Sequence, residues 1–85
     1  MAMEIDHDGR KPLKYQLADL LREQIMSGEL APDRAIPSEQ QLMQRYELGR
    51  DTVRAGVAIL KEEGYLVAER GRGTFVRPRE EWPAQ

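Results

Sequence analysis

The chain has 85 residues, of which 13 are basic and 15 acidic, and its formal net charge is −2. A chain of this length folds as one small domain that buries only about 60% of its potential surface, which leaves little room for a deep catalytic pocket. With no cysteine and a single histidine it lacks the side chains for a disulfide framework or a typical zinc site, so we expect no metal and no cofactor.

Residues 1–11 are polar and carry no apolar periodicity, so we expect a flexible N-terminal tail there. A repeating pattern begins at Pro12, and apolar residues recur at steps of three and four until Ser27-Gly28. This spacing predicts an amphipathic helix with proline in its first turn and glycine at its end. The predicted apolar face consists of Leu13, Leu17, Leu20, Leu21, Ile25 and Met26.

A turn and a second helix are predicted next. Pro32-Asp33 has the residues of a turn, and Ala35-Ile36 is typical of a very short extended piece. Ser38 followed by Gln41 forms a capping box, which marks the start of a short helix. The inward side of that helix comprises Leu42, Met43 and Tyr46.

A third periodic segment, residues 50–64, follows a tight connection. Gly49 suits its N-cap and Gly64 suits its C-terminal end. At about 100° per residue, its apolar direction runs through Val53, Val57 and Leu60. The other side is formed by Arg50 on its flank, Asp51, Arg54, Ala55 and Ala58. Because little bulk surrounds the two arginines, they can approach a partner closely.

The last predicted element is a β-hairpin. Two strand-like segments, residues 66–68 and 74–76, flank a polar, glycine-bearing turn at residues 69–73. The alternative is a glycine-rich loop that cradles a phosphate in an enzyme. Such a loop leads into a helix, whereas a strand and Pro78 follow here. We therefore expect a hairpin, no enzymatic activity, and a flexible tail or linker at residues 78–85.

Basic side chains concentrate in the second half of the chain. Residues 45–79 carry eight basic and five acidic side chains, whereas residues 1–44 carry five basic and eight acidic ones. A solvated charged face is the commoner explanation of such a balance. The order of elements favours another one, because two helices joined by a short glycine-containing turn form a helix-turn-helix. Its second helix fits the major groove of B-DNA, about 12 Å wide.

Residues at the start of this second helix and at the hairpin tip are candidates for DNA contacts. Arg50 and Arg54 can each donate two parallel hydrogen bonds to guanine, with two solvated arginines as the simpler alternative. Thr52 can donate to a phosphate or merely cap the helix. The hairpin supplies a wing whose tip can lie along the DNA backbone or enter a narrow minor groove.

Three fragments of the sequence occur in a characteristic order and spacing: SGELAPDRAIPSEQQL, RDTVR and EGYLVAERGRGTFV. Together they resemble the N-terminal winged helix-turn-helix domain of the GntR family of bacterial transcription regulators, over residues 12 to 76. The resemblance implies a mostly α fold with a small β-sheet (α+β), in which three helices precede a C-terminal β-hairpin wing. We place this domain at residues 12–77.

The resemblance also implies roles for matching residues. Arg50 and Arg54 match arginines that contact bases and backbone in the major groove, and Thr52 matches a threonine that contacts phosphate. Gly71 matches a wing glycine that meets the minor groove. The remaining DNA-binding candidates are Arg70 and Arg72 on the wing, Ser38, Gln40, Gly49 and Asp51.

Several positions depart from the family pattern. Gln40 replaces a commonly basic residue and can bond to a phosphate or an adenine without adding charge. Gly49 lacks the hydroxyl of the common N-cap residues. Asp51 replaces a threonine or serine, and it can complement the helix N-terminus, pair with Arg54 or accept from cytosine. Gly56 stands in place of alanine and should cost about 1 kcal/mol in a helix interior. Fewer phosphate contacts predict weaker binding with a shallower salt dependence.

The function implied by the resemblance is sequence-specific regulation of transcription, by a repressor that blocks an inverted-repeat operator. The expected partner is double-stranded DNA, bound by a homodimer that is weak or monomeric in solution without an effector domain. A winged helix that binds protein instead is the alternative, and the net acidity suits it. The sequence shows neither a signal peptide nor the roughly 20 apolar residues of a membrane helix, so we expect a cytoplasmic protein.

Overall fold

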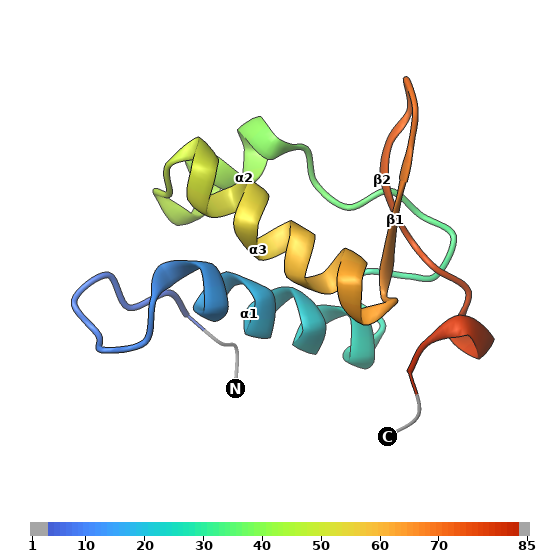
Figure 1. Cartoon of the computed structure of the whole chain (residues 1–85), viewed down its shortest axis with the longest axis horizontal. Coiled ribbons are helices and arrows are strands. Elements are labelled where there is room, and N and C mark those ends of the chain that lie inside the picture. Colours follow the sequence, from blue (N-terminus) through green and yellow to red (C-terminus); the bar gives the residue numbers. More distant parts are fainter. Residues whose placement is uncertain (1–3, 84–85) are drawn as a thin grey trace.

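The structure is a computed structural model, and it describes residues 4–83. Three α-helices form the body of this part of the chain, and a two-stranded antiparallel hairpin projects from it (Figure 1). The elements are α1 (Leu13–Ser27), α2 (Glu39–Tyr46), α3 (Arg50–Glu63), β1 (Leu66–Glu69), β2 (Gly73–Val76) and a short 3-10 turn (Arg79–Glu81). The predicted fold class, three helices followed by a β-hairpin, is confirmed. No helix within residues 4–83 is long and apolar enough to cross a membrane.

The core lies where α1 packs along α3 (Figure 1). Most of the predicted apolar face of α1 is buried, but Met26 is 39% exposed, so its assignment to that face is wrong. Met26 follows Ile25, the last buried residue of α1, and the rotation of about 100° per residue places it at the margin of the buried face. The buried apolar residues are Leu17, Ala18, Leu20, Leu21, Ile25, Ile36, Leu42, Leu48, Val53, Leu60, Tyr65, Leu66 and Val76.

Gly56 lies at a close approach of α3 to α1. A Cβ atom added there would lie 2.9 Å from Leu17 Cδ2 and 3.1 Å from the backbone oxygen of Lys14. Leu17 is fully buried, so it cannot move aside freely. The sequence predicts only a loss of helix propensity at Gly56. The structure shows in addition that the missing side chain lets the two helices pack.

The predicted capping box opens α2. The Ser38 hydroxyl accepts a hydrogen bond from the Gln41 backbone N–H at 3.1 Å, and Gln41 Oε1 accepts one from the Ser38 N–H at 2.8 Å. After α2, the buried Leu48 anchors the turn, and Gly49 is the N-cap of α3, as predicted. This short turn sets α3 against α2 as in a helix-turn-helix.

The two strands of the hairpin pair in antiparallel register, from Leu66 opposite Val76 to Glu69 opposite Gly73. Both strands therefore extend one residue further toward the tip than the sequence predicts. In Figure 1 the tip projects away from α1, on the side of the molecule where α2 and the start of α3 lie.

The second edge of β2 is covered by residues 33–36. The Ile36 N–H donates to the Thr74 oxygen and the Val76 N–H to the Arg34 oxygen, both at 2.9 Å. This pairing confirms the short extended piece predicted before α2. It also ties the hairpin to the segment that leads into α2, which fixes the wing relative to the helices.

Residues 78–83 fold back onto the base of the hairpin. The Trp82 ring lies 5.9 Å from the Tyr65 ring, and its indole N–H donates to the Arg77 oxygen at 2.8 Å. The Arg79 guanidinium lies over the Trp82 ring, 5.0 Å from its centroid. The composition of residues 78–85 predicts a flexible tail or linker and does not predict these contacts. Residues 84–85 lie outside the described part of the chain.

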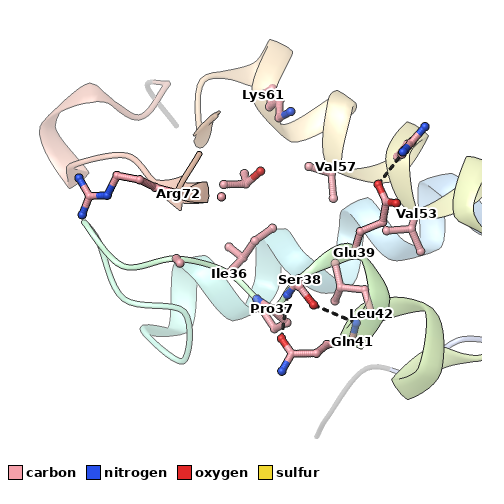
Figure 2. A pocket seen from close by; sticks show the side chains of 14 residues that line it. Ile36, Pro37, Ser38, Glu39, Gln41, Leu42, Val53, Val57, Lys61 and Arg72 are labelled. Atoms are coloured by element: carbon pink, nitrogen blue, oxygen red, sulfur yellow. Dashed lines mark hydrogen bonds and ion pairs between the residues drawn. The ribbon is translucent and has the colours of Figure 1, made fainter. Parts of the chain in front are cut away.

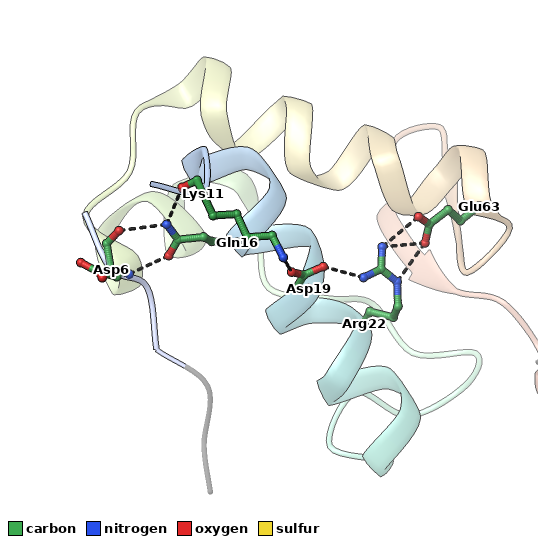
Figure 3. Close-up of polar contacts among 6 residues, drawn as sticks. All are labelled: Asp6, Lys11, Gln16, Asp19, Arg22 and Glu63. Atoms are coloured by element: carbon green, nitrogen blue, oxygen red, sulfur yellow. Dashed lines mark hydrogen bonds and ion pairs between the residues drawn. The ribbon is translucent and has the colours of Figure 1, made fainter. Parts of the chain in front are cut away.

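Residues 4–11 lie against α1 through a chain of polar contacts (Figure 3). Gln16 bonds to the backbone oxygen of Lys11, whose ammonium group pairs with Asp19. Arg22 then joins Asp19 to Glu63, with both ion pairs at 2.8 Å. The chain of contacts thus links the N-terminal segment, α1 and the last turn of α3. Residues 1–3 of the predicted tail lie outside the described residues.

Candidate nucleic-acid interface

Two arginines and a glutamate lie close together at the N-terminal end of α3. The side chains of Arg50 and Arg54, one turn apart, are 57% and 62% exposed. Glu39, in the first turn of α2, accepts a hydrogen bond from Arg54 Nε at 2.7 Å and lies 3.2 Å from Arg50 Nε. The bond from Arg54 holds the pKa of the Glu39 carboxyl below its ordinary value, and Glu39 raises the pKa of Arg54. Arg54 therefore forms its ion pair with Glu39 and not with Asp51.

Glu39 is a site residue that the sequence reasoning missed. It stands beside the capping serine of α2, where an acidic residue has an ordinary reason to occur because it complements the helix N-terminus. Its pairing with arginines of the next helix depends on how α3 packs against α2, which no local pattern reveals. Each guanidinium has five N–H donors, so a shared carboxylate orients both arginines and still leaves donors for a partner.

Thr52 lies on a different side of α3 from the arginines. Its half-buried side chain and the exposed Asp51 border a shallow hollow beside the start of α1. This hollow, of about 340 Å³, is lined by Pro12, Leu13, Lys14, Asp51, Thr52 and Ala55. The structure does not bring Thr52 to the side of Arg50 and Arg54, and its phosphate contact stays a prediction.

The tip of the hairpin is a turn from Glu69 to Arg72. The Arg72 N–H donates to the Glu69 oxygen at 2.9 Å, and Gly71 has a φ of 76°, the left-handed conformation that a type II turn needs at its third position. Arg70, Gly71 and Arg72 are exposed, and the Arg72 guanidinium lies 5.3 Å from the centroid of the Phe75 ring. The turn alone explains why position 71 is a glycine, and a contact between Gly71 and DNA stays a prediction.

The other three candidates lie at the helix starts. The Ser38 hydroxyl is engaged in the capping box, Gln40 is exposed in the first turn of α2, and Gly49 is exposed before α3. A Cβ atom added at Gly49 would meet nothing within 4 Å. DNA contacts by these three residues stay predictions.

A groove of about 640 Å³ separates α3 from the hairpin (Figure 2). The start of α2 and residues 35–37 line it together with α3 and β2. Of the predicted site residues, it brings Ser38, Arg54 and Arg72 together, and the others lie outside it. The lining residues are Ala35, Ile36, Pro37, Ser38, Glu39, Gln41, Leu42, Val53, Arg54, Val57, Lys61, Arg72, Gly73 and Thr74.

A helix-turn-helix with two exposed arginines at the start of its second helix and a basic hairpin beside it defines the winged helix-turn-helix class. Residues 13–76 match the family described as bacterial regulatory proteins, gntR family. The chain belongs to this family.

Curated relatives and solved structures agree with this membership. The HTH-type transcriptional repressor NagR of Bacillus subtilis is 39% identical over 84 residues, which are 98% of this chain and 35% of NagR. YtrA from Sulfolobus acidocaldarius, a GntR-family transcription factor, superposes with a TM-score of 0.83 at 29% identity, over 93% of this chain and 83% of YtrA.

A further solved structure, AraR(DBD) in complex with operator ORX1, has a TM-score of 0.77 at 32% identity. The match covers 89% of this chain and 98% of the AraR chain. The present chain spans about a third of the length of the curated relatives that it matches.

Proposed function

We propose that this chain binds double-stranded DNA as the winged helix-turn-helix unit of a GntR-type transcription regulator. The observation that carries the proposal is the pair Arg50 and Arg54, exposed on one side of α3 and oriented by Glu39. With the start of α3 in the major groove, both guanidinium groups face base edges, and the hairpin tip faces the adjacent minor groove. The similarity to AraR(DBD), solved in complex with an operator, supports the binding of double-stranded DNA.

The regulatory outcome that we propose is repression by occupation of an operator. NagR is a transcriptional repressor, and this chain matches about a third of its length. We further propose that two copies bind the half-sites of an inverted repeat, about one helical turn apart, in the cytoplasm. A role in binding protein rather than DNA is not favoured, because the relatives are transcription regulators.

A salt titration tests DNA binding directly. The affinity for a random-sequence duplex is measured by gel shift at low and at moderate salt. We expect binding that weakens steeply with salt, and a variant with both Arg50→Ala and Arg54→Ala that binds at least roughly tenfold more weakly. The control is Arg10→Ala, an exposed arginine of the N-terminal segment. The proposal fails if the unmodified chain shows no salt-dependent binding at tens of micromolar.

A further inference from the structure

Lys61 continues the cationic side of α3 toward the hairpin. It follows Arg54 by seven residues, about two helical turns, and therefore lies on the same side of the helix. Val57 lies between them and is half-buried. All three residues line the groove between α3 and the hairpin, where Lys61 is exposed (Figure 2).

Arg72 stands on the other wall of this groove, and its guanidinium lies over the Phe75 ring and points away from Lys61 (Figure 2). Neither Lys61 nor Arg72 forms an ion pair with any residue in the range 4–83, whereas Arg54 is paired with Glu39, which Arg50 shares. Lys61 therefore brings an unpaired positive charge to the groove, and Arg72 brings another at its hairpin edge. Its remaining lining includes Ile36, Val53 and Val57, apolar side chains that displace water and strengthen the attraction between those cations and an anion.

The geometry of DNA identifies the anion. In B-DNA the major and minor grooves are separated by a single sugar–phosphate strand. A protein with α3 in one groove and a hairpin in the next must straddle that strand, and the hollow between the two elements is where it passes. We propose, on the basis of the DNA-binding function above, that Lys61 contacts this strand from the α3 side, and that the exposed Arg72 side chain turns from the Phe75 ring to contact it from the hairpin side. Lys61 is then a DNA-contacting residue that reads no sequence.

The inference is tested with Lys61→Gln, Arg72→Gln and the charge-matched control Arg10→Gln. The probes are two unrelated duplexes, and log K is plotted against log salt concentration. Each groove variant should flatten the slope by about 0.9, the value for one lost phosphate contact, and weaken binding by roughly tenfold at moderate salt. The losses should be the same on both duplexes, Arg10→Gln should match the unmodified chain, and Lys61→Arg should restore the slope.

A simpler role for Lys61 is to complement the C-terminal end of the α3 dipole, and the same data separate the two. In that case Lys61→Gln would lower the thermal midpoint slightly and leave the slope unchanged, which overturns the proposal. A loss on only one duplex would indicate a base contact and also overturn it. If the slope is unchanged while the Arg50 and Arg54 variant loses affinity, the DNA-binding proposal stands and the proposed contacts of Lys61 and Arg72 with the DNA strand are wrong. If the unmodified chain does not bind at all, both fail.

Discussion

Glu39 holds a negative charge at the surface that we propose for DNA. Its carboxylate orients two arginines, and it also repels phosphates and competes with them for the same N–H donors. We therefore expect Glu39 to increase sequence selectivity. Base edges at fixed positions can replace the hydrogen bonds that the arginines make to the carboxylate, whereas a loosely bound DNA backbone replaces them less well.

Glu39→Gln should therefore increase the affinity for random-sequence DNA by about threefold at low salt, and by less at higher salt. Discrimination between a selected sequence and random DNA should fall at the same time, because the arginines lose their orientation. Binding is measured by fluorescence anisotropy with labelled duplexes. Glu62→Gln is the control, since Glu62 is an exposed carboxylate in the last turn of α3. Equal gains in the two variants would reduce the effect of Glu39 to net charge.

Gly56→Ala should destabilise the protein by about 1 kcal/mol. Alanine gains about 1 kcal/mol of helix propensity, but the new methyl group must displace the buried Leu17 or the backbone at Lys14, and such overpacking costs about 1 to 3 kcal/mol. The measurement is urea unfolding followed by the fluorescence of Trp82, the single tryptophan of the sequence. Ala58→Gly, on the exposed side of the same helix, should lose about 1 kcal/mol from propensity alone. A Gly56→Ala variant more stable than the parent would show that the helices separate easily.

For single residues, the sequence predicts those features that neighbouring residues in the chain determine. The capping of α2 by Ser38 and Gln41 follows from residues three apart, and the exposure of Arg50 and Arg54 follows from helical rotation. The partner of those arginines and the tight contact at Gly56 could not be predicted. Both depend on the distance and angle between two helices, which are set by side chains far apart in the chain.

Among the elements, α3 has a weakly capped N-terminus. Gly49 is its N-cap with an extended backbone, and within residues 4–83 no side chain bonds to the free N–H groups of the first turn. Asp51 is the only acidic residue in that turn. The element that is proposed to enter the major groove thus begins with less support than α2, whose start has a complete capping box.

Gly49→Ser should stabilise the protein by about 0.5 kcal/mol, because a serine hydroxyl can accept from the unpaired N–H groups and there is space for its Cβ atom. Thermal unfolding by circular dichroism measures the change. Gly49→Ala fills the same space without the hydroxyl and serves as the matched control. If alanine stabilises as much as serine, the gain comes from the unfolded chain and not from capping.

The hairpin could be predicted from its sequence pattern, whereas the packing of the C-terminal segment could not. Both strands could be predicted from their residues and the turn between them. Residues 78–83 are polar and proline-bearing, which is typical of a tail, yet Trp82 packs on Tyr65 at the base of the hairpin. That contact arises because antiparallel pairing brings the end of β2 beside Tyr65, the residue that precedes β1. The composition of residues 78–83 does not reveal this.

Across the whole molecule, the polar chain from Lys11 to Glu63 couples stability to pH. Burial raises the pKa of Asp19, but hydrogen bonds from Lys11 and Arg22 outweigh it, and the pKa lies below its ordinary value of 3.8. The pKa of Glu39 likewise lies below 4.5. Both groups bind protons more readily in the unfolded chain. Their contribution to stability is therefore present above the ordinary pKa values and is lost as the pH falls through the folded ones.

The free energy of unfolding should accordingly stay level from about pH 7 to 5 and decrease below about pH 4. Asp19→Asn should lower it by about 1 kcal/mol at neutral pH and by progressively less in acid, so that the two curves converge. Urea unfolding at a series of pH values, followed by Trp82 fluorescence, measures both curves. A constant difference between parent and variant down to about pH 2 would mean that Asp19 acts through packing and not through its charge.

The pairing of β2 with residues 33–36 bears on how copies of this protein meet each other when concentrated. An open strand edge is a template on which another chain can add a strand and begin to aggregate. One edge of this sheet is already occupied by the chain itself, and the free edge, that of β1, is only four residues long. The wing can therefore stand out from the body and remain a single hairpin.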